Sequence, residues 1–267
     1  MHTTEMEAIT YTVLDGVATL TLNRPEQKNA LDNVMRAEIA EVVAAIRHDR
    51  GIQALVIAGA GGVFCAGGDL RAMQETHGAE AARNRMKELY LWLEDLFSLD
   101  RPVIAAVDGP AYGAGFGLAL AADLILATPR TRFCLSFMRM GVIPDCGITY
   151  TLPRMVGLQR AKELIFSARE FDAEEAKQIG IVSEIYPADQ LAERARQIAL
   201  SFTQASATAV SLTKSALNAS FNSSLGTMLE MEANAQGVAR STEYHRDAVA
   251  RFMSKQPPLF QWPKRTE

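Results

Sequence analysis

The stretch ALVIAGAGGVFCAGGDL, residues 54–70, decides the fold. Ala54–Ala58 is a short apolar run typical of a buried strand, and a loop with five glycines follows it. The pattern recurs in VIAAVDGPAYGAGFG, residues 103–117, where a second apolar run leads into a second glycine-rich loop. Strands that alternate with helices pair in parallel, so the two stretches predict an α/β fold.

The rest of the chain extends this α/β pattern and then turns helical. Ile9–Leu14 and Val17–Leu22 flank Asp15-Gly16, a two-residue hairpin signal. Asp32 is expected to cap a helix with apolar residues at helical spacing. Further strands are expected at Leu124–Ala127 and Ile181–Ile185, and helices at Ala188–Thr203, Ala205–Ala219, Leu225–Ala239 and Thr242–Met253. We predict a core over residues 1–190 and a helical region over residues 191–267.

Composition excludes several classes of function. The 27 Lys and Arg against 31 Asp and Glu leave a net charge of −4, so no nucleic-acid partner is expected. Three cysteines without a paired motif and four scattered histidines predict no disulfide framework and no metal site. The N-terminus lacks an apolar core, and the apolar stretch Gly109–Ala122 is shorter than the roughly 20 residues of a membrane span. A cytoplasmic protein without membrane contact is expected.

The two glycine-rich loops indicate a binding site for an oxygen atom. Glycine lets backbone N–H groups approach a ligand closely, and two such loops together could hold an oxygen that becomes negative during a reaction. The alternative is that the glycines only permit tight turns. Neither loop matches the dinucleotide fingerprint or the P-loop.

Four segments resemble the enoyl-CoA hydratase/isomerase (crotonase) family. Val63–Leu70 and Pro102–Asp123 are similar to its two signature segments, Asn23–Leu31 to its N-terminal motif, and Phe252–Lys255 to its C-terminal element. The resemblance implies the crotonase (ClpP-like) fold, a spiral of ββα units with two roughly perpendicular sheets. It also implies that the C-terminal helices pack on neighbours in a homo-oligomer, a trimer or a dimer of trimers.

The family pattern implies site residues at matching positions. It assigns the thioester oxygen of an acyl-CoA to the N–H groups of Gly68 and Ala114. No separate cofactor is implied, because coenzyme A is part of the substrate. Substrate contacts are implied for Lys28, Ala30, Leu31, Ala66, Gly67, Asp69, Leu70 and Phe137. Phe252 and Lys255 match residues that reach the CoA of a neighbouring subunit, although Lys255 also fits a solvated terminal lysine.

Two departures from the family pattern concern the chemistry. Hydratases of the family carry glutamates where this chain has Gly117 and Phe137, and neither residue can titrate. Asp145 stands where several isomerases carry Asp. A single carboxylate buried beside Phe137 and Ile143 would have a raised pKa and could shuttle a proton. Alternatively, Asp145 caps a helix beginning at Cys146.

These departures favour an enoyl-CoA isomerase that moves a double bond between positions 3 and 2. The alternatives are an enoyl-CoA hydratase and an acyl-CoA-binding pseudoenzyme without turnover. Acyl chain length and pathway are not predicted.

Overall fold

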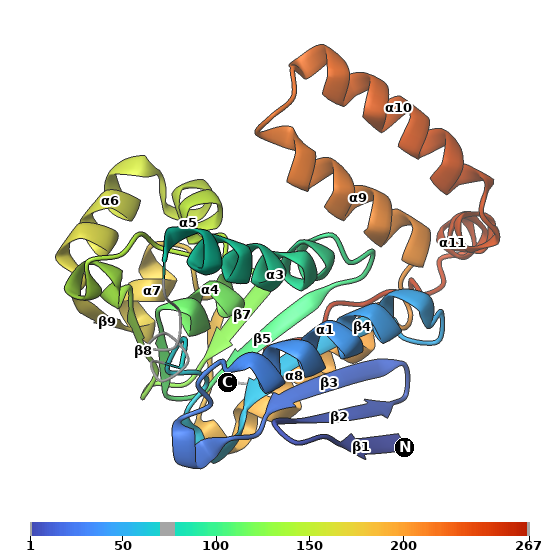
Figure 1. Ribbon diagram of the computed structural model, residues 1–267. Helices are drawn as coiled ribbons and strands as arrows, with labels where there is room; N and C mark the ends of the chain where they lie inside the picture. The colour runs from blue at the N-terminus through green and yellow to red at the C-terminus, as the bar shows by residue number, and fades with distance from the viewer. Residues whose placement is uncertain (1, 70–77, 266–267) are drawn as a thin grey trace.

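The computed structural model describes residues 2–69 and 78–265 and is built around a seven-stranded sheet (Figure 1). The strand order is β1-β2-β3-β4-β5-β7-β10. The first three strands are antiparallel, and every pair from β3 to β10 is parallel. The strands are β1 (His2–Glu5), β2 (Ile9–Leu14), β3 (Val17–Leu22), β4 (Ala54–Gly59), β5 (Val103–Val107), β7 (Leu124–Ala127) and β10 (Glu184–Ile185).

The expected hairpin joins β2 and β3. Asp15 and Gly16 have φ angles of 52° and 77°, and Leu14 pairs with Val17. Positive φ at both turn residues matches the twist of the two strands, which explains the Asp-Gly sequence.

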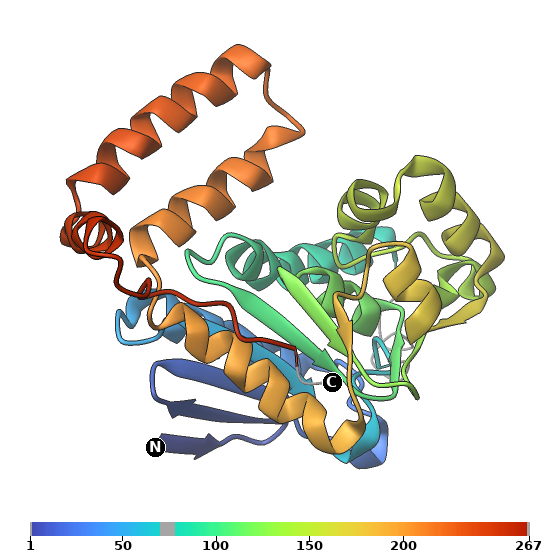
Figure 2. The same cartoon turned by 180° about the vertical axis from the view of Figure 1, so that it is seen from behind.

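Helices cover both faces of the sheet. On one face lie α1 (Asn33–His48) and α3 (Ala79–Phe97), and on the other lies α8 (Ala188–Phe202) (Figures 1 and 2). Asp32 caps α1 as expected, accepting a 2.9 Å hydrogen bond from the N–H of Met35. In β4, Leu55 belongs to the larger apolar cluster with α1, whereas Val56 packs with α8. This alternation of side chains buries both faces of the strand.

A smaller three-stranded sheet lies beside the main one. It consists of β6 (Pro110–Tyr112), β8 (Arg132–Cys134) and β9 (Glu170–Asp172). Phe116, Phe133 and Phe171 pack together there, with ring centroids 4.8 to 5.8 Å apart. The connecting elements are η1 (Pro25–Gln27), η2 (Ala60–Gly62), α4 (Ala114–Leu120), η3 (Ser136–Met140), α5 (Ile148–Val156), α6 (Leu158–Ser167) and α7 (Ala173–Gln178).

The last three helices form an arm that projects from the core (Figure 1). They are α9 (Ala207–Ser220), α10 (Leu225–Ser241) and α11 (Glu243–Met253), and none of them has a buried residue. The tail beyond α11 returns along α8, as Figure 2 shows. The ring of Phe202 contacts those of Phe260 and Trp262 in this tail.

The structure confirms the expected strand at Leu124–Ala127 but differs at the last expected strand. The expected strand Ile181–Ile185 is wrong for its first three residues, and only Glu184–Ile185 pairs with β7. The N–H groups of Ile181 and Val182 instead donate to the carbonyl of Ala176, in a turn after α7. These two residues are buried by the turn and not by a sheet.

Across the described ranges, no helix has both the length and the apolar character that crossing a bilayer requires.

Candidate functional site

The two glycine-rich loops lie against each other at one edge of the main sheet. They are Gly59–Asp69, after β4, and Asp108–Gly117, after β5, and these two strands are parallel neighbours. The N–H of Cys65 donates to the carbonyl of Pro110 at 3.1 Å, and that of Tyr112 donates to the carbonyl of Cys65 at 2.9 Å. Parallel pairing therefore brings the loops together by backbone hydrogen bonds.

Glycine is required where the loops meet. Gly109 has a φ of 71°, and a Cβ there would lie 2.1 Å from the carbonyl oxygen of Gly62. Gly67 has a φ of 105°, and its Cβ would lie 2.9 Å from the carbonyl oxygen of Tyr112 and 3.7 Å from the nitrogen of Ala114. The expectation that glycine permits close backbone approach is therefore met at both positions.

The N–H groups of Gly68 and Ala114 are available at this junction. In the part of the chain that the structure describes, the N–H of Gly68 donates to no backbone carbonyl. Ala114 is the first residue of α4, so its N–H has no partner one turn earlier within the helix. A Cβ on Gly67 would lie 3.7 Å from the nitrogen of Ala114, so the residue before Gly68 lies close to the start of α4. Two such donors aimed at one point would stabilise a developing negative charge on oxygen.

A short extended segment runs beside the first loop. It brings together six residues with implied substrate contacts: Lys28, Ala30, Leu31, Ala66, Gly67 and Asp69. The N–H of Ala66 donates to Lys28 at 3.0 Å, that of Leu31 to Gly67 at 2.8 Å, and that of Asp69 to Leu31 at 3.2 Å. Leu31 is fully buried, and its N–H and carbonyl are both used by the first loop, so the structure exposes no part of it to a ligand.

Asn29 organises this segment, a role that the sequence reading did not assign. Its fully buried side chain accepts from the N–H of Arg24 at 2.8 Å and donates to the carbonyls of Ala60 and Val63 at 2.9 and 2.7 Å. The side chain therefore ties the segment to the start of the first glycine loop. The only signal in the sequence was an asparagine within Asn23–Leu31, the segment that resembles the N-terminal motif of the family.

Asp145 lies between η3 and α5 with one carboxylate oxygen buried. This oxygen, Oδ1, accepts no hydrogen bond from the described residues. The side chain lines a cavity of about 550 Å³ together with Tyr90 and Leu93 of α3. Burial raises the pKa of Asp145, against smaller opposing effects of the Cys146 side chain and of the Arg36 charge. A carboxylate in such surroundings is a stronger base than one in water.

The helix-cap reading of Asp145 is wrong. Helix α5 begins at Ile148 with Gly147 at its N-cap position, and no side chain caps it. Asp145 contributes only its backbone carbonyl, which accepts from the N–H of Ile148 at 3.1 Å. The expected burial beside Ile143 is also wrong, because Ile143 is 76% exposed, whereas Phe137 is buried.

The two positions at which hydratases of the family carry glutamates are occupied here by buried residues. Gly117 is buried in α4. Phe137 is buried in η3, and its Cζ atom lies 3.8 Å from the place where a Cβ of Gly113 would be. Phe137 therefore borders the second glycine loop, but neither position offers an ionisable group.

The C-terminal residues are not brought to this site within one chain. Phe252 closes α11 with 81% of its surface exposed, and Lys255 follows it in an exposed turn. Both belong to the C-terminal end of the arm, and α11 lies well away from α4 (Figure 1). Leu70, also implied to contact substrate, lies outside the described residues.

Cys65 and Tyr112 are held in structural roles. Burial raises the pKa of Cys65 to about 12, so its thiol is not ionised and is a poor nucleophile near neutral pH. The hydroxyl of Tyr112 donates to Glu170 at 2.9 Å. Arg139 donates to the carbonyl of Ala168 at 2.6 Å. Tyr112 thus links β6 to β9 of the smaller sheet, and Arg139 links η3 to the end of α6.

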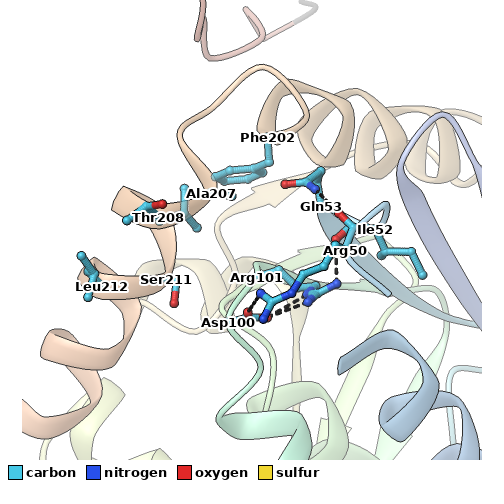
Figure 3. Close-up of a pocket in the computed structure, with 11 residues that line it drawn as sticks. Arg50, Ile52, Gln53, Asp100, Arg101, Phe202, Ala207, Thr208, Ser211 and Leu212 are labelled. Carbon is cyan, nitrogen blue, oxygen red and sulfur yellow. Dashed lines mark hydrogen bonds and ion pairs between the residues drawn. The ribbon is translucent and has the colours of Figure 1, made fainter. Parts of the chain in front are cut away.

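A second cavity, of about 270 Å³, lies where α9 meets the base of the sheet (Figure 3). On one side, Arg101 donates to the Asp100 carboxylate at 2.8 and 2.9 Å and to the carbonyls of Asp49 and Ile52 at 2.7 Å. The facing side is formed by Ala207, Thr208, Ser211 and Leu212 (Figure 3). Its lining includes neither Asp145 nor any residue of the glycine loops, so we do not place the functional site there.

Comparison of the chain with known proteins identifies one family. The family model described as Enoyl-CoA hydratase/isomerase matches residues 12–263. The chain is 36% identical to the 1,2-epoxyphenylacetyl-CoA isomerase of Escherichia coli, over 96% of this chain and 98% of that protein. It is 34% identical to the 2,3-dehydroadipyl-CoA hydratase of Escherichia coli, over 91% and 94% of the two chains.

A solved structure extends the match to the fold. The crystal structure of an enoyl-CoA hydratase/isomerase from Cupriavidus metallidurans superposes with a TM-score of 0.95, at 44% identity, over 98% of this chain and all of that one. The fold expected from the sequence is confirmed.

Proposed function

Because the chain belongs to the enoyl-CoA hydratase/isomerase family and processes acyl-CoA, we propose that it is an isomerase that moves a double bond from position 3 to position 2. One observation carries the proposal. Asp145 lines a cavity and has a buried carboxylate oxygen that accepts no hydrogen bond from the described residues, whereas Glu94, the other carboxylate in that lining, is exposed, and Gly117 and Phe137 cannot titrate.

The proposed reaction needs one proton shuttle and one charge acceptor. The N–H groups of Gly68 and Ala114 donate to the thioester oxygen. Asp145 removes a proton from C2 of a 3-enoyl-CoA, and the electron pair moves into the thioester to give a dienolate. Asp145 then returns the proton to C4, which leaves the double bond between C2 and C3. Its raised pKa suits both the removal and the return of the proton.

Binding of coenzyme A is assigned to the segment beside the first loop. Lys28, Ala30, Ala66 and Asp69 are the exposed or half-buried residues there, and their backbones are fixed by hydrogen bonds. We propose that the arm joins copies of the chain into a homo-oligomer, a trimer or a dimer of trimers. Phe252 and Lys255 of one copy then reach the coenzyme A bound to another.

Hydration is the second candidate. It is favoured by the name of the 2,3-dehydroadipyl-CoA hydratase, which is nearly as similar to this chain as the isomerase is. Water addition needs one group to activate water and another to protonate the α-carbon. The two glutamate positions of the family hydratases hold Gly117 and Phe137, and Glu94, which also lines the Asp145 cavity, is exposed, so isomerisation is the better supported reaction.

The test compares wild type and Asp145→Asn on a 3-enoyl-CoA and a 2-enoyl-CoA. Wild type is expected to isomerise the 3-enoyl-CoA and not to hydrate the 2-enoyl-CoA. Asp145→Asn should lower kcat by about 10⁴, the upper end for a general acid/base group, and abolish exchange of C2 protons with deuterated solvent. Calorimetric affinity for a saturated acyl-CoA should be unchanged.

Asp189→Asn, an exposed carboxylate at the start of α8, serves as the control and should be fully active. Rapid hydration of the 2-enoyl-CoA by the wild type would show that the protein is a hydratase and would overturn the proposed isomerisation. Acyl-CoA binding with neither reaction would favour a pseudoenzyme. Near-normal isomerisation by Asp145→Asn would remove Asp145 from the mechanism.

A further inference from the structure

Helix α4 makes two close contacts through glycines, one on each side of the site. A Cβ on Gly115 would lie 2.4 Å from the carbonyl oxygen and 2.6 Å from the Cβ of Cys65, in the loop that carries Gly68. A Cβ on Gly117 would lie 2.6 Å from the Cβ of Cys146, the residue after Asp145. Real Cβ atoms essentially never approach other atoms this closely, so both positions require glycine.

Cys146, the residue that packs against Gly117, lies in a strained segment of the backbone. Cys146 has a φ of 49°, in the left-handed region that side chains other than those of glycine, asparagine and aspartate rarely adopt, and Gly147 follows at 73°. Such strain persists only where surrounding packing holds it. Cys146 is 1% exposed and is pressed against α4, so α4 supplies that packing.

The position of Asp145 follows from this arrangement. Only Cys146 and Gly147 separate Asp145 from α5, and both are in the left-handed conformation. A shift of Cys146 away from α4 would therefore carry the Asp145 carboxylate with it. The same helix begins with Ala114, whose N–H is assigned to the thioester oxygen. One short helix thus fixes the distance between the proposed base and the proposed oxyanion donors.

We propose that Gly117, through its contact with Cys146, is a positioning residue that sets where the Asp145 carboxylate stands relative to the Ala114 N–H. This inference rests on the proposed function, because it assumes that Asp145 carries the proton. It predicts that the size of the side chain at 117 controls turnover without affecting the binding of coenzyme A.

The charges around Asp145 determine how displacement would be seen. Arg36 of α1, Tyr90 of α3 and the neighbouring Cys146 interact electrostatically with it, and Glu94 of α3 lines the same cavity. Burial is the largest influence on its pKa and raises it. Moving the carboxylate toward solvent would lower that pKa, so the acidic limb of the kcat/KM profile should shift to lower pH.

The test is a double-mutant cycle at positions 117 and 146. Gly117→Ala should lower kcat by about 10²-fold, the loss that follows a displacement of about 1 Å at a reacting group, with KM changed less than about threefold. Its acidic limb should shift to lower pH. Cys146→Gly removes the opposing Cβ and should lower kcat by about tenfold, because the loop loses its packing contact.

The combined variant Gly117→Ala/Cys146→Gly leaves one methyl group in place of the two opposed Cβ atoms, and should recover kcat to within about threefold of wild type, above Cys146→Gly. Gly117→Ala/Cys146→Ala keeps both Cβ atoms and should show no recovery. The decisive result is a change of sign between backgrounds. Gly117→Ala should lower kcat in the wild-type protein and raise it in the Cys146→Gly variant. Should Gly117→Ala alone fail to fold, the comparison of Cys146→Gly with the combined variant still decides.

The outcomes separate the two proposals. A wild type that isomerises and an inactive Asp145→Asn, together with a Gly117→Ala of normal kcat, would overturn the positioning role alone. A further loss of kcat in the combined variant relative to Cys146→Gly would overturn it as well. A wild type without isomerase activity, or an active Asp145→Asn, would overturn the proposed function.

Discussion

The core and the arm of this chain differ in how their helices are stabilised. Helix α8 of the core buries Leu191, Ala195 and Ile198 against the main sheet. Helices α9, α10 and α11 bury no residue, and exposed apolar side chains such as Leu225 (75%) lie along them. Each arm helix nevertheless begins with a side-chain cap, from Ser206, Ser224 and Thr242.

This difference indicates that the core is complete within one chain and the arm is not. Caps stabilise a helix by about 1 kcal/mol each, but an apolar face needs a second surface to gain stability. Both glycine loops and Asp145 belong to the core. We therefore expect changes in the core to affect folding and turnover, and changes in the arm to affect association.

The largest effect is expected at the contact between the glycine loops. Gly109→Ala combines left-handed strain of about 1 to 2 kcal/mol with a clash against the Gly62 carbonyl of about 1 to 3 kcal/mol. We expect unfolding in urea to show a loss of about 4 kcal/mol. Gly141→Ala is the control, because it is left-handed with φ 67° and ψ 27° but no atom lies within 4 Å, so only the strain applies. Equal losses in both variants would contradict the close-contact explanation.

The next effect is expected where the core meets the tail. Glu184 is buried, accepts from Arg194 at 2.8 and 3.1 Å, and accepts from Arg265 at 3.0 Å. Breaking one partner of a buried ion pair costs about 3 to 5 kcal/mol, so Glu184→Gln should lose about 3 kcal/mol at pH 7. Glu193→Gln, which removes an exposed pair with Arg196, should lose less than about 1 kcal/mol.

The pH dependence of this pair has a definite sign. Burial opposes ionisation of Glu184, but hydrogen bonds from the Arg194 and Arg265 side chains outweigh it and lower its pKa. The stabilisation is therefore present above the unfolded pKa of about 4.3 and is lost as pH falls through the folded value. The stability difference between wild type and Glu184→Gln should shrink on acidification. A difference that grows at low pH would contradict the pairing.

The smallest effect on the core is expected from the arm. Leu225→Glu puts a charge on an exposed apolar position of α10 and should lower the mass measured by light scattering toward that of one chain. The free energy of unfolding of the core should change by less than about 0.5 kcal/mol. Leu158→Glu, at a 61% exposed leucine of α6, should keep the wild-type mass. An unchanged mass in Leu225→Glu, or a monomeric wild type, would contradict the role of the arm.

Elements with clear periodicity or turn signals could be predicted from the sequence, including the four-residue strand β7, whereas β6, β8, β9 and the 19-residue helix α3 were not. The hairpin around Asp15, the helix capped by Asp32 and the strands after which the glycine loops begin carry periodicity or turn signals over five or more residues. The strands β6, β8 and β9 have three residues each, too few for an alternating pattern to stand out. Strand β1 lies in a polar segment whose pairing with β2 leaves little apolar signal.

The candidate site was predicted unevenly for a similar reason. Glycine spacing indicated the two loops, and the resemblance pointed to Gly68, Ala114 and Asp145. The roles of Asn29 and Cys146 depend on contacts between residues at least 29 positions apart in sequence, and no local pattern encodes them. A buried amide and a strained cysteine look ordinary until their neighbours are known.

The tail contacts make the arm an insertion in the chain rather than an extension of it. The ring of Phe202, just before the arm begins, lies 5.8 Å from that of Phe260 and 6.0 Å from that of Trp262, just after it ends. The backbone therefore leaves and re-enters the core at one point, the arrangement in which inserted segments are best tolerated. A short linker in place of residues 204–257 would keep both anchors, so the arm can be exchanged as a module while the path of the core stays the same.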